Sequence, residues 1–129
     1  FAMLTLGTAT GLAREAVDQL RSEGKRAGLI KLRFMRPFPF KELCQACEGL
    51  KALGVFDRSA SFNGGGPVHT EVAAALCNVP TAVTGHVAGI GGRDITPAHM
   101  LEMYGIVERA SRGEKVRQVT WHGLRGDME

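Results

Sequence analysis

Short apolar runs and amphipathic segments alternate along the whole chain. The apolar runs have the length of β-strands, and in the segments between them apolar residues recur every three or four positions, the spacing of one helix face. The predicted strands are residues 1–6, 27–34, 51–57 and 81–89, followed by a fifth, edge strand at 115–123. The predicted helices are residues 8–24, 41–50, 67–77 and 96–113.

This order of elements predicts one α/β domain that covers residues 1–129. The expected architecture is a three-layer α/β/α arrangement around a mostly parallel, open sheet of about five strands, with right-handed crossovers. Because the carboxyl ends of parallel strands lie at one edge of a sheet, the loops at 7–11, 34–40, 57–67 and 88–97 are expected to gather there. Ligands of such sheets usually bind at that edge.

Composition narrows the class of protein. The chain has 129 residues, 44% hydrophobic and 22% charged, with a net charge of +3. These values are ordinary for a soluble globular domain. Basic residues are scattered and are not interleaved with aromatic residues, so we expect no nucleic-acid binding. No apolar run is long enough for a membrane span, no basic leader precedes the first strand, and the start on a phenylalanine resembles a piece of a longer chain.

The three cysteines and the histidines do not form a recognisable metal site. Cys44 and Cys47 make a C-x-x-C pair, which could be a redox pair or half of a metal site, but positions three apart on a helix also share one face. Cys77 is the only other cysteine, so the chain alone cannot hold a four-cysteine iron–sulfur cluster. We expect core packing, no bound metal, and a reducing, cytoplasmic compartment. His86 and His99 have no partner at metal-ligand spacing.

Two glycine-rich turns precede predicted helices. The first, LGTATG, can hold an anion on backbone N–H groups, or can be a tight turn with Thr8 or Thr10 as a helix cap, which we favour. The second contains the run Gly64–Gly66, which allows close backbone approach and is a candidate anion or contact site. His69 and Glu71 are two residues apart and do not share a helix face, so we expect no catalytic pair.

The stretch GGRDITP places an arginine and an aspartate where the fourth strand turns into the last helix. Asp94 lies two residues before Thr96, the predicted N-cap, and is expected to accept backbone N–H bonds that tie the turn to that helix. Arg93 can reach outward to a phosphate or carboxylate, or can pair with Asp57 at a neighbouring strand end. The residues alone show no nucleophile, catalytic base or metal site, which favours a support or binding domain.

Three stretches together resemble one enzyme family. LGTATGLAREAVDQLRSEGKRAGLIKLRFMRPFPFKEL, VFDRSASFNGGGPVHTEV and AGIGGRDITP are similar to the alpha subunit of 2-oxoacid:ferredoxin oxidoreductases, the pyruvate:ferredoxin oxidoreductase family. The matching part is the C-terminal domain, which has the fold of transketolase C-terminal domains. The resemblance runs from about Met3 to about Tyr104, and the tail WHGLRGDME has no counterpart in it.

The resemblance implies the chemistry of the whole enzyme. Thiamine diphosphate with Mg²⁺ attacks the 2-oxo carbon, CO₂ leaves, electrons pass through iron–sulfur clusters to ferredoxin or flavodoxin, and coenzyme A takes the acyl group. The thiamine site lies between another alpha-subunit domain and the beta subunit, and the cluster cysteines lie on other chains or domains. This domain is therefore expected to bind none of these cofactors alone and to be inactive alone, with beta, gamma and delta subunits or fused equivalents as partners.

The positions that match the family pattern are carried over as structural or interface residues, not as catalysts. They are Arg36, Pro37, Phe38, Pro39, Asp57, Arg58, Gly91, Gly92 and Asp94. Arg93, Gly64, Gly65 and Gly66 are carried over as residues that border the coenzyme A side or a domain interface. The alternatives are the equivalent domain of a transketolase or a 2-oxoacid dehydrogenase beta chain, a pure assembly domain, and a free-standing module that binds an anion or coenzyme A.

Overall fold

The apolar runs form a single parallel sheet of five strands with the order β2-β1-β3-β4-β5. The structure is a computed structural model that describes residues 1–62 and 64–125. The strands are β1 (Ala2–Thr5), β2 (Gly28–Lys31), β3 (Ala52–Asp57), β4 (Ala82–Val87) and β5 (Val119–Trp121). The helices are α1 (Ala9–Ser22), α2 (Phe40–Ala46), α3 (Pro67–Ala75) and α4 (Pro97–Ser111), with a short 3₁₀ helix, η1 (Ile90–Gly92), before α4.

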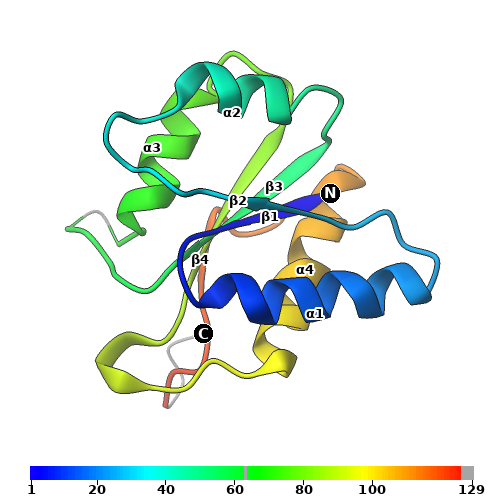
Figure 1. Ribbon diagram of the computed structural model, residues 1–129. Coiled ribbons are helices and arrows are strands. Elements are labelled where there is room, and N and C mark those ends of the chain that lie inside the picture. Colours follow the sequence, from blue (N-terminus) through cyan, green and yellow to red (C-terminus); the bar gives the residue numbers. More distant parts are fainter. Residues whose placement is uncertain (63, 126–129) are drawn as a thin grey trace.

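The helices cover both faces of the sheet, which confirms the predicted three-layer α/β/α fold. Figure 1 shows α2 and α3 on one side of the strands and α1 and α4 on the other. Each strand except the last is followed by a helix that returns the chain to the amino end of the next strand, because parallel strands need such a crossover. No helix in residues 1–62 and 64–125 is long and apolar enough to span a membrane.

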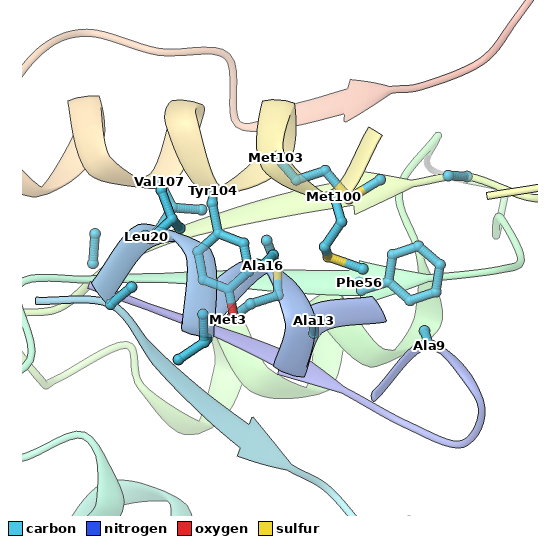
Figure 2. Close-up of a cluster of buried hydrophobic side chains, with 14 of the residues drawn as sticks. Met3, Ala9, Ala13, Ala16, Leu20, Phe56, Met100, Met103, Tyr104 and Val107 are labelled. Atoms are coloured by element: carbon cyan, nitrogen blue, oxygen red, sulfur yellow. The ribbon is translucent and has the colours of Figure 1, made fainter. Parts of the chain in front are cut away.

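One hydrophobic core lies between the sheet and the pair α1 and α4. Figure 2 shows the large side chains of α4 packed over the small side chains of α1. Its buried members include Met3, Ala9, Ala13, Ala16, Leu20, Phe56, Met100, Met103, Tyr104 and Val107. The Tyr104 hydroxyl donates a hydrogen bond of 3.0 Å to the Gly28 carbonyl oxygen, and burial raises the pKa of this phenol. This hydrogen bond joins α4 to β2, the edge strand on the far side of the sheet from β5.

The second core lies under α2 and α3 and contains the cysteine pair. Cys47 is fully buried beside Leu43 and Leu76, and burial raises the pKa of its thiol. Cys44 is half-buried, and its sulfur lies 3.6 Å from the Ala75 carbonyl oxygen. A raised thiol pKa disfavours the reactive thiolate. The packing interpretation of the C-x-x-C pair is confirmed, and Cys77 lies apart from it at the surface.

Gly54 allows the closest approach between the sheet and α4. A Cβ atom there would lie 2.5 Å from Cγ2 of Val107 and 2.9 Å from Sδ of Met3. We therefore expect Gly54→Ala to lower the free energy of unfolding by about 1–3 kcal/mol, the usual cost of overpacking. In a Val107→Ala background, which frees the space, the same substitution should cost much less. Chemical denaturation of the four proteins measures this, and equal costs in both backgrounds would contradict the packing argument.

Candidate functional site

The sheet has its topological switch point between β1 and β3, and a cleft lies there at the carboxyl ends of the strands. From β1 the chain crosses to β2 on one side, and later to β3 on the other, so the loops after β1 and β3 diverge. Such a point is where open α/β sheets bind ligands. The cleft has a volume of about 260 Å³. We call it the switch-point cleft. It is lined by Leu6, Gly7, Thr8, Phe56, Asp57, Arg58, Ser59 and Val68.

Asp57 ends β3 and caps α3 from the floor of this cleft. Its Oδ1 accepts the Val68 backbone N–H at 3.0 Å, and its Oδ2 accepts the His69 N–H at 2.9 Å. The side chain is only 2% exposed. Burial raises the pKa of the Asp57 carboxyl, against the opposing effect of these two hydrogen bonds. Asp57 therefore holds the start of α3, and it makes no ion pair with Arg93.

Gly66 makes this cap possible. A Cβ atom at position 66 would overlap the Asp57 carboxyl group, although the backbone of Gly66 is extended and would accept any residue. The first-turn N–H groups of α3, which the glycine run was expected to offer to an anion, are thus bound to a carboxylate of the chain itself. The preceding loop closes on itself, since Ser61 N–H donates to the Gly65 carbonyl at 2.7 Å.

The turn between β1 and α1 differs from the prediction in one detail. Thr8 is the N-cap residue of α1, but its side chain makes no capping hydrogen bond. Thr10 lies inside the helix, and its hydroxyl bonds to that of Thr5 at 3.0 Å in a buried position. The expected side-chain cap by Thr8 or Thr10 is therefore wrong, because the Thr10 hydroxyl binds β1 instead. The start of α1 remains open toward the switch-point cleft.

Arg58 is the cation of the switch-point cleft. It follows Asp57 directly, is exposed, and makes no hydrogen bond or ion pair with any residue that the structure describes. Its Nε passes close to Gly89, where a Cβ atom would lie 3.1 Å away. The guanidinium thus lies near the ends of β3 and β4, where the absence of a side chain at Gly89 leaves room for it. Its donors are available for a partner outside the described part of the chain.

Arg93 lies further along the same edge and binds the segment that follows β5. Its Nη1 donates to the Gly123 carbonyl oxygen at 2.5 Å. The two glycines before it have positive φ values, 68° at Gly91 and 75° at Gly92, which only glycine adopts readily. They let η1 turn sharply, so that Arg93 leaves the turn toward the segment after β5. Of the two alternatives for Arg93, the pairing with Asp57 is not formed, because the guanidinium donates to Gly123 instead.

The predicted role of Asp94 is wrong. Asp94 is exposed and makes no hydrogen bond or ion pair within residues 1–62 and 64–125. A capping box starts α4 instead: the Thr96 hydroxyl accepts the His99 N–H, and His99 Nδ1 accepts the Thr96 N–H, both at 3.2 Å. Thr96 is thus the N-cap, as predicted. The side chains of Thr96 and His99 thus form the reciprocal cap that was expected of Asp94.

The Arg36–Phe40 segment braces the loop after β2 against α3. Arg36 Nη2 lies 2.6 Å from Glu71 Oε1, and the Phe38 ring packs edge-on against that of Phe40 at 4.9 Å. Pro37 and Pro39 flank Phe38, and the Arg36–Pro37 peptide bond is cis. Phe34 and Phe62, on the loops after β2 and β3, are strongly exposed. The carboxyl edge therefore presents aromatic side chains that the described residues do not cover.

A chain of polar groups, buried except at Glu102, joins β4, the residue after β5 and α4. His86 Nε2 lies 3.0 Å from the Thr84 hydroxyl, and its Nδ1 lies 3.1 Å from His122 Nε2. His122 Nδ1 lies 3.3 Å from Glu102 Oε1. Burial lowers the pKa of His86 to about 3 and also lowers the pKa of His122, so both rings are neutral at pH 7.

The ring nitrogens can be assigned from the one acceptor at the end of this chain. A carboxylate only accepts, so a proton on His122 Nδ1 would face Glu102, although the 3.3 Å approach is not a formed hydrogen bond. His122 Nε2 then accepts from His86 Nδ1–H, and His86 Nε2 accepts from the Thr84 hydroxyl. His86 has no partner at metal-ligand spacing in the sequence, and no local pattern pointed to His122. Within the described ranges, no group of three or more His, Cys, Asp or Glu side chains is arranged to hold a metal ion.

The fold and the switch-point cleft define a class: a doubly wound domain with glycine-rich loops at the carboxyl edge of its sheet. Residues 1–100 match the family described as pyruvate:ferredoxin oxidoreductase core domain II, and the chain belongs to this family. The family resemblance of the sequence motifs is thereby confirmed.

Similar proteins are subunits of 2-oxoacid oxidoreductases. The chain is 40% identical over 127 residues to pyruvate synthase subunit PorA of Methanothermobacter thermautotrophicus, with 98% of this chain and 31% of the relative covered. It is 34% identical to ketoisovalerate oxidoreductase subunit VorA of Pyrococcus furiosus, covering 97% and 32%. It is 41% identical to the alpha subunit of NADH-dependent phenylglyoxylate dehydrogenase of Aromatoleum evansii, covering 78% and 25%. The chain thus spans about a third or less of the length of these relatives.

Proposed function

We propose that the chain is the second core domain of the alpha subunit of a thiamine-diphosphate-dependent 2-oxoacid:ferredoxin oxidoreductase. The whole enzyme decarboxylates a 2-oxoacid oxidatively to an acyl-coenzyme A and passes the electrons through iron–sulfur clusters to ferredoxin or flavodoxin. The family match over residues 1–100 carries this proposal. The expected compartment is the cytoplasm, in agreement with the unpaired cysteines.

The domain itself supports assembly and borders the active site. Its carboxyl edge carries the exposed rings of Phe34 and Phe62 and the exposed cation Arg58, features that suit a contact with another domain or subunit. Arg93 and the Gly64–Gly66 run lie on loops of this same edge, and we keep them as residues that border the coenzyme A side or a domain interface. The capped start of α3 makes an interface the better role for the glycines.

The substrate is a 2-oxoacid, and the residues that recognise its side chain lie outside this domain. Pyruvate is the default, since pyruvate synthase subunits recur among the relatives. Other relatives are named for ketoisovalerate and phenylglyoxylate, although their corresponding domains are similar to this chain at comparable identities. A domain shared by enzymes of such different substrates is a poor place for the residues that select the substrate.

The assembled enzyme tests this function. The complete alpha subunit, co-produced with its partner subunits and loaded with thiamine diphosphate and iron–sulfur clusters, is expected to reduce ferredoxin in the presence of a 2-oxoacid and coenzyme A. Pyruvate, ketoisovalerate and phenylglyoxylate are compared as substrates. An intact, cofactor-loaded complex that oxidises none of the three would contradict the proposal.

Arg58→Ala and Arg93→Ala are expected to weaken coenzyme A use or subunit association by about 1–3 kcal/mol each, the cost of losing a charged hydrogen bond. Steady-state titration with coenzyme A and analytical ultracentrifugation of the complex measure the two effects separately. Arg14→Ala, which removes the same charge from the exposed side of α1, is the control and should change neither. If Arg58→Ala and Arg93→Ala both show wild-type coenzyme A titrations and wild-type association, neither arginine borders the coenzyme A site or a subunit interface.

A further inference from the structure

No strand within residues 1–62 and 64–125 pairs with the outer edge of β5, and the surroundings of this edge have the shape and charge of a binding site for one more strand. We propose that, in the assembled oxidoreductase, an extended acidic segment of another subunit pairs with β5 as a sixth strand. The inference rests on the proposed function, because it takes the partner from the same complex. It goes beyond that function by naming the surface, the backbone groups and the chemistry of the segment.

The register of β5 leaves its odd-numbered residues unpaired. The His122 N–H donates to the Val87 carbonyl at 2.9 Å, and the Gly85 N–H donates to the Gln118 carbonyl at 2.7 Å. Even-numbered residues therefore face β4, while the N–H and C=O groups of Val119 and Trp121 point away from the sheet. These groups have no partner among the described residues. Such a row of donors and acceptors is a template for an added strand.

A hollow lies on each face of this edge. On the α4 side, a groove of about 490 Å³ is lined by all three β5 residues together with Glu102, Ile106, Arg109, Lys115, Val116 and Arg117. On the α3 side, a smaller hollow of about 210 Å³ is lined by Gly65, His69, Thr70, Ala73, Gln118 and Val119. Successive side chains of a strand point to opposite faces. A strand on β5 would therefore place its side chains alternately into the two hollows.

The two hollows differ in charge, and this difference determines which side chains an added strand should carry on each of its faces. The α4-side groove is lined by one acidic residue, Glu102, and three basic ones. Arg109 is paired with Glu114 at 2.8 Å, whereas Lys115 and Arg117 are exposed and have no ion pair with any described residue, so the charge of the groove is net positive. The α3-side hollow is lined by small or uncharged groups, since burial lowers the pKa of His69 and keeps its ring neutral at pH 7. The segment should therefore alternate acidic residues, facing Lys115 and Arg117, with small uncharged residues.

Trp121 supplies an apolar anchor beside these charges. It is the last residue of β5 and is 37% exposed, although a tryptophan at a sheet edge gains by being covered. Aromatic and arginine side chains are the residues that most often dominate protein–protein contacts. The same basic residues could instead only guard a free edge against pairing, as edge strands often do. The two roles make opposite predictions for the assembled enzyme.

Hydrogen exchange at single amides separates the two roles. The complete alpha subunit is compared alone and within the purified, catalytically tested complex. We expect the amides of Val119 and Trp121 to exchange about tenfold or more slowly in the complex, because an added strand would bond them. Equal exchange at both amides in an intact complex would overturn the proposal and leave a guarded, solvent-facing edge. Since the same sample is assayed with 2-oxoacids, failure of the proposed function is detected separately.

A charge reversal tests the acidic character of the segment without altering the strand. The double variant Lys115→Glu/Arg117→Glu should weaken association of the alpha subunit with its partner by about tenfold or more at low salt, with a smaller effect at high salt. Arg26→Glu/Lys51→Glu is the matched control, with the same charge change at exposed positions near the amino end of the sheet. Unchanged association of the first variant, or equal loss in both, would overturn the proposal.

Discussion

Gly66→Ala is expected to be among the most destabilising single-methyl additions in this chain. The new Cβ would occupy the place of the Asp57 carboxyl group, so the carboxylate must leave the start of α3. The first-turn N–H groups of α3 then lose their hydrogen bonds to the buried carboxylate. This loss should lower the free energy of unfolding by about 3 kcal/mol or more. Urea denaturation followed by circular dichroism measures the loss. Because the backbone at Gly66 is extended, conformational strain contributes nothing to it.

A double-mutant cycle isolates this mechanism. Asp57→Ala alone should also destabilise the fold by about 2–4 kcal/mol, since it removes the same cap. In that background the space beside position 66 is empty, so adding Gly66→Ala should cost less than about 1 kcal/mol. Gly65→Ala, one residue earlier in the same loop, provides a comparison for glycine replacement in general. Additive losses from Asp57→Ala and Gly66→Ala would show that the glycine serves another purpose.

The second large effect is acid destabilisation through His86. Its pKa is about 3 in the folded protein, far below the ordinary value of 6.5, because the ring is buried and faces a second histidine. Between these two values the unfolded chain binds a proton that the folded chain does not. Stability is therefore complete above about pH 6.5 and falls as the pH drops toward 3, by on the order of 5 kcal/mol in total from this group.

Substitution of His86 should flatten this pH dependence. His86→Gln keeps a polar side chain but cannot titrate, so its free energy of unfolding should fall by about 1.4 kcal/mol less per pH unit than that of the wild type across this window. Thr84→Val is the control, because it removes one hydrogen bond and keeps the titrating ring. The titratable groups that face the pair are the carboxylate of Glu102 and the neighbouring rings of His69 and His99. Parallel curves for wild type and His86→Gln would contradict this assignment.

The architecture was predictable because each element carries its own periodic signal. The limits of the elements were less so, as the second strand shows. An apolar pattern continues through residues 32–34, yet β2 ends at Lys31. The reason is its partner: β1 ends at Thr5, whose carbonyl accepts a last bond from Leu32, and no strand remains beyond it to pair with. The local hydrophobic pattern predicts that a segment forms a strand. The length of that strand depends on how far the neighbouring strand extends beside it.

The candidate site was located by the sequence, but its connections were not. The four loops of the carboxyl edge follow from the order of strands and helices alone. The capping of α3 by Asp57 joins residues eleven and twelve positions apart and depends on β3 lying directly beside α3. Local rules favoured Asp94 as the residue that ties the turn to α4, but the capping box of Thr96 and His99 does so instead. The His86–His122 contact arises only because β5 lies parallel to β4.

The chain contains a single tryptophan and a single tyrosine, and the fold places them in opposite environments. Tyr104 is completely enclosed in the core, while Trp121 lies partly exposed at the open end of the sheet. Each aromatic chromophore therefore responds to a different event. Emission excited selectively from the indole should move to shorter wavelength when that edge is covered, and the near-ultraviolet dichroism of the phenol should change only when the core opens. The protein thus carries its own optical labels for association and for unfolding.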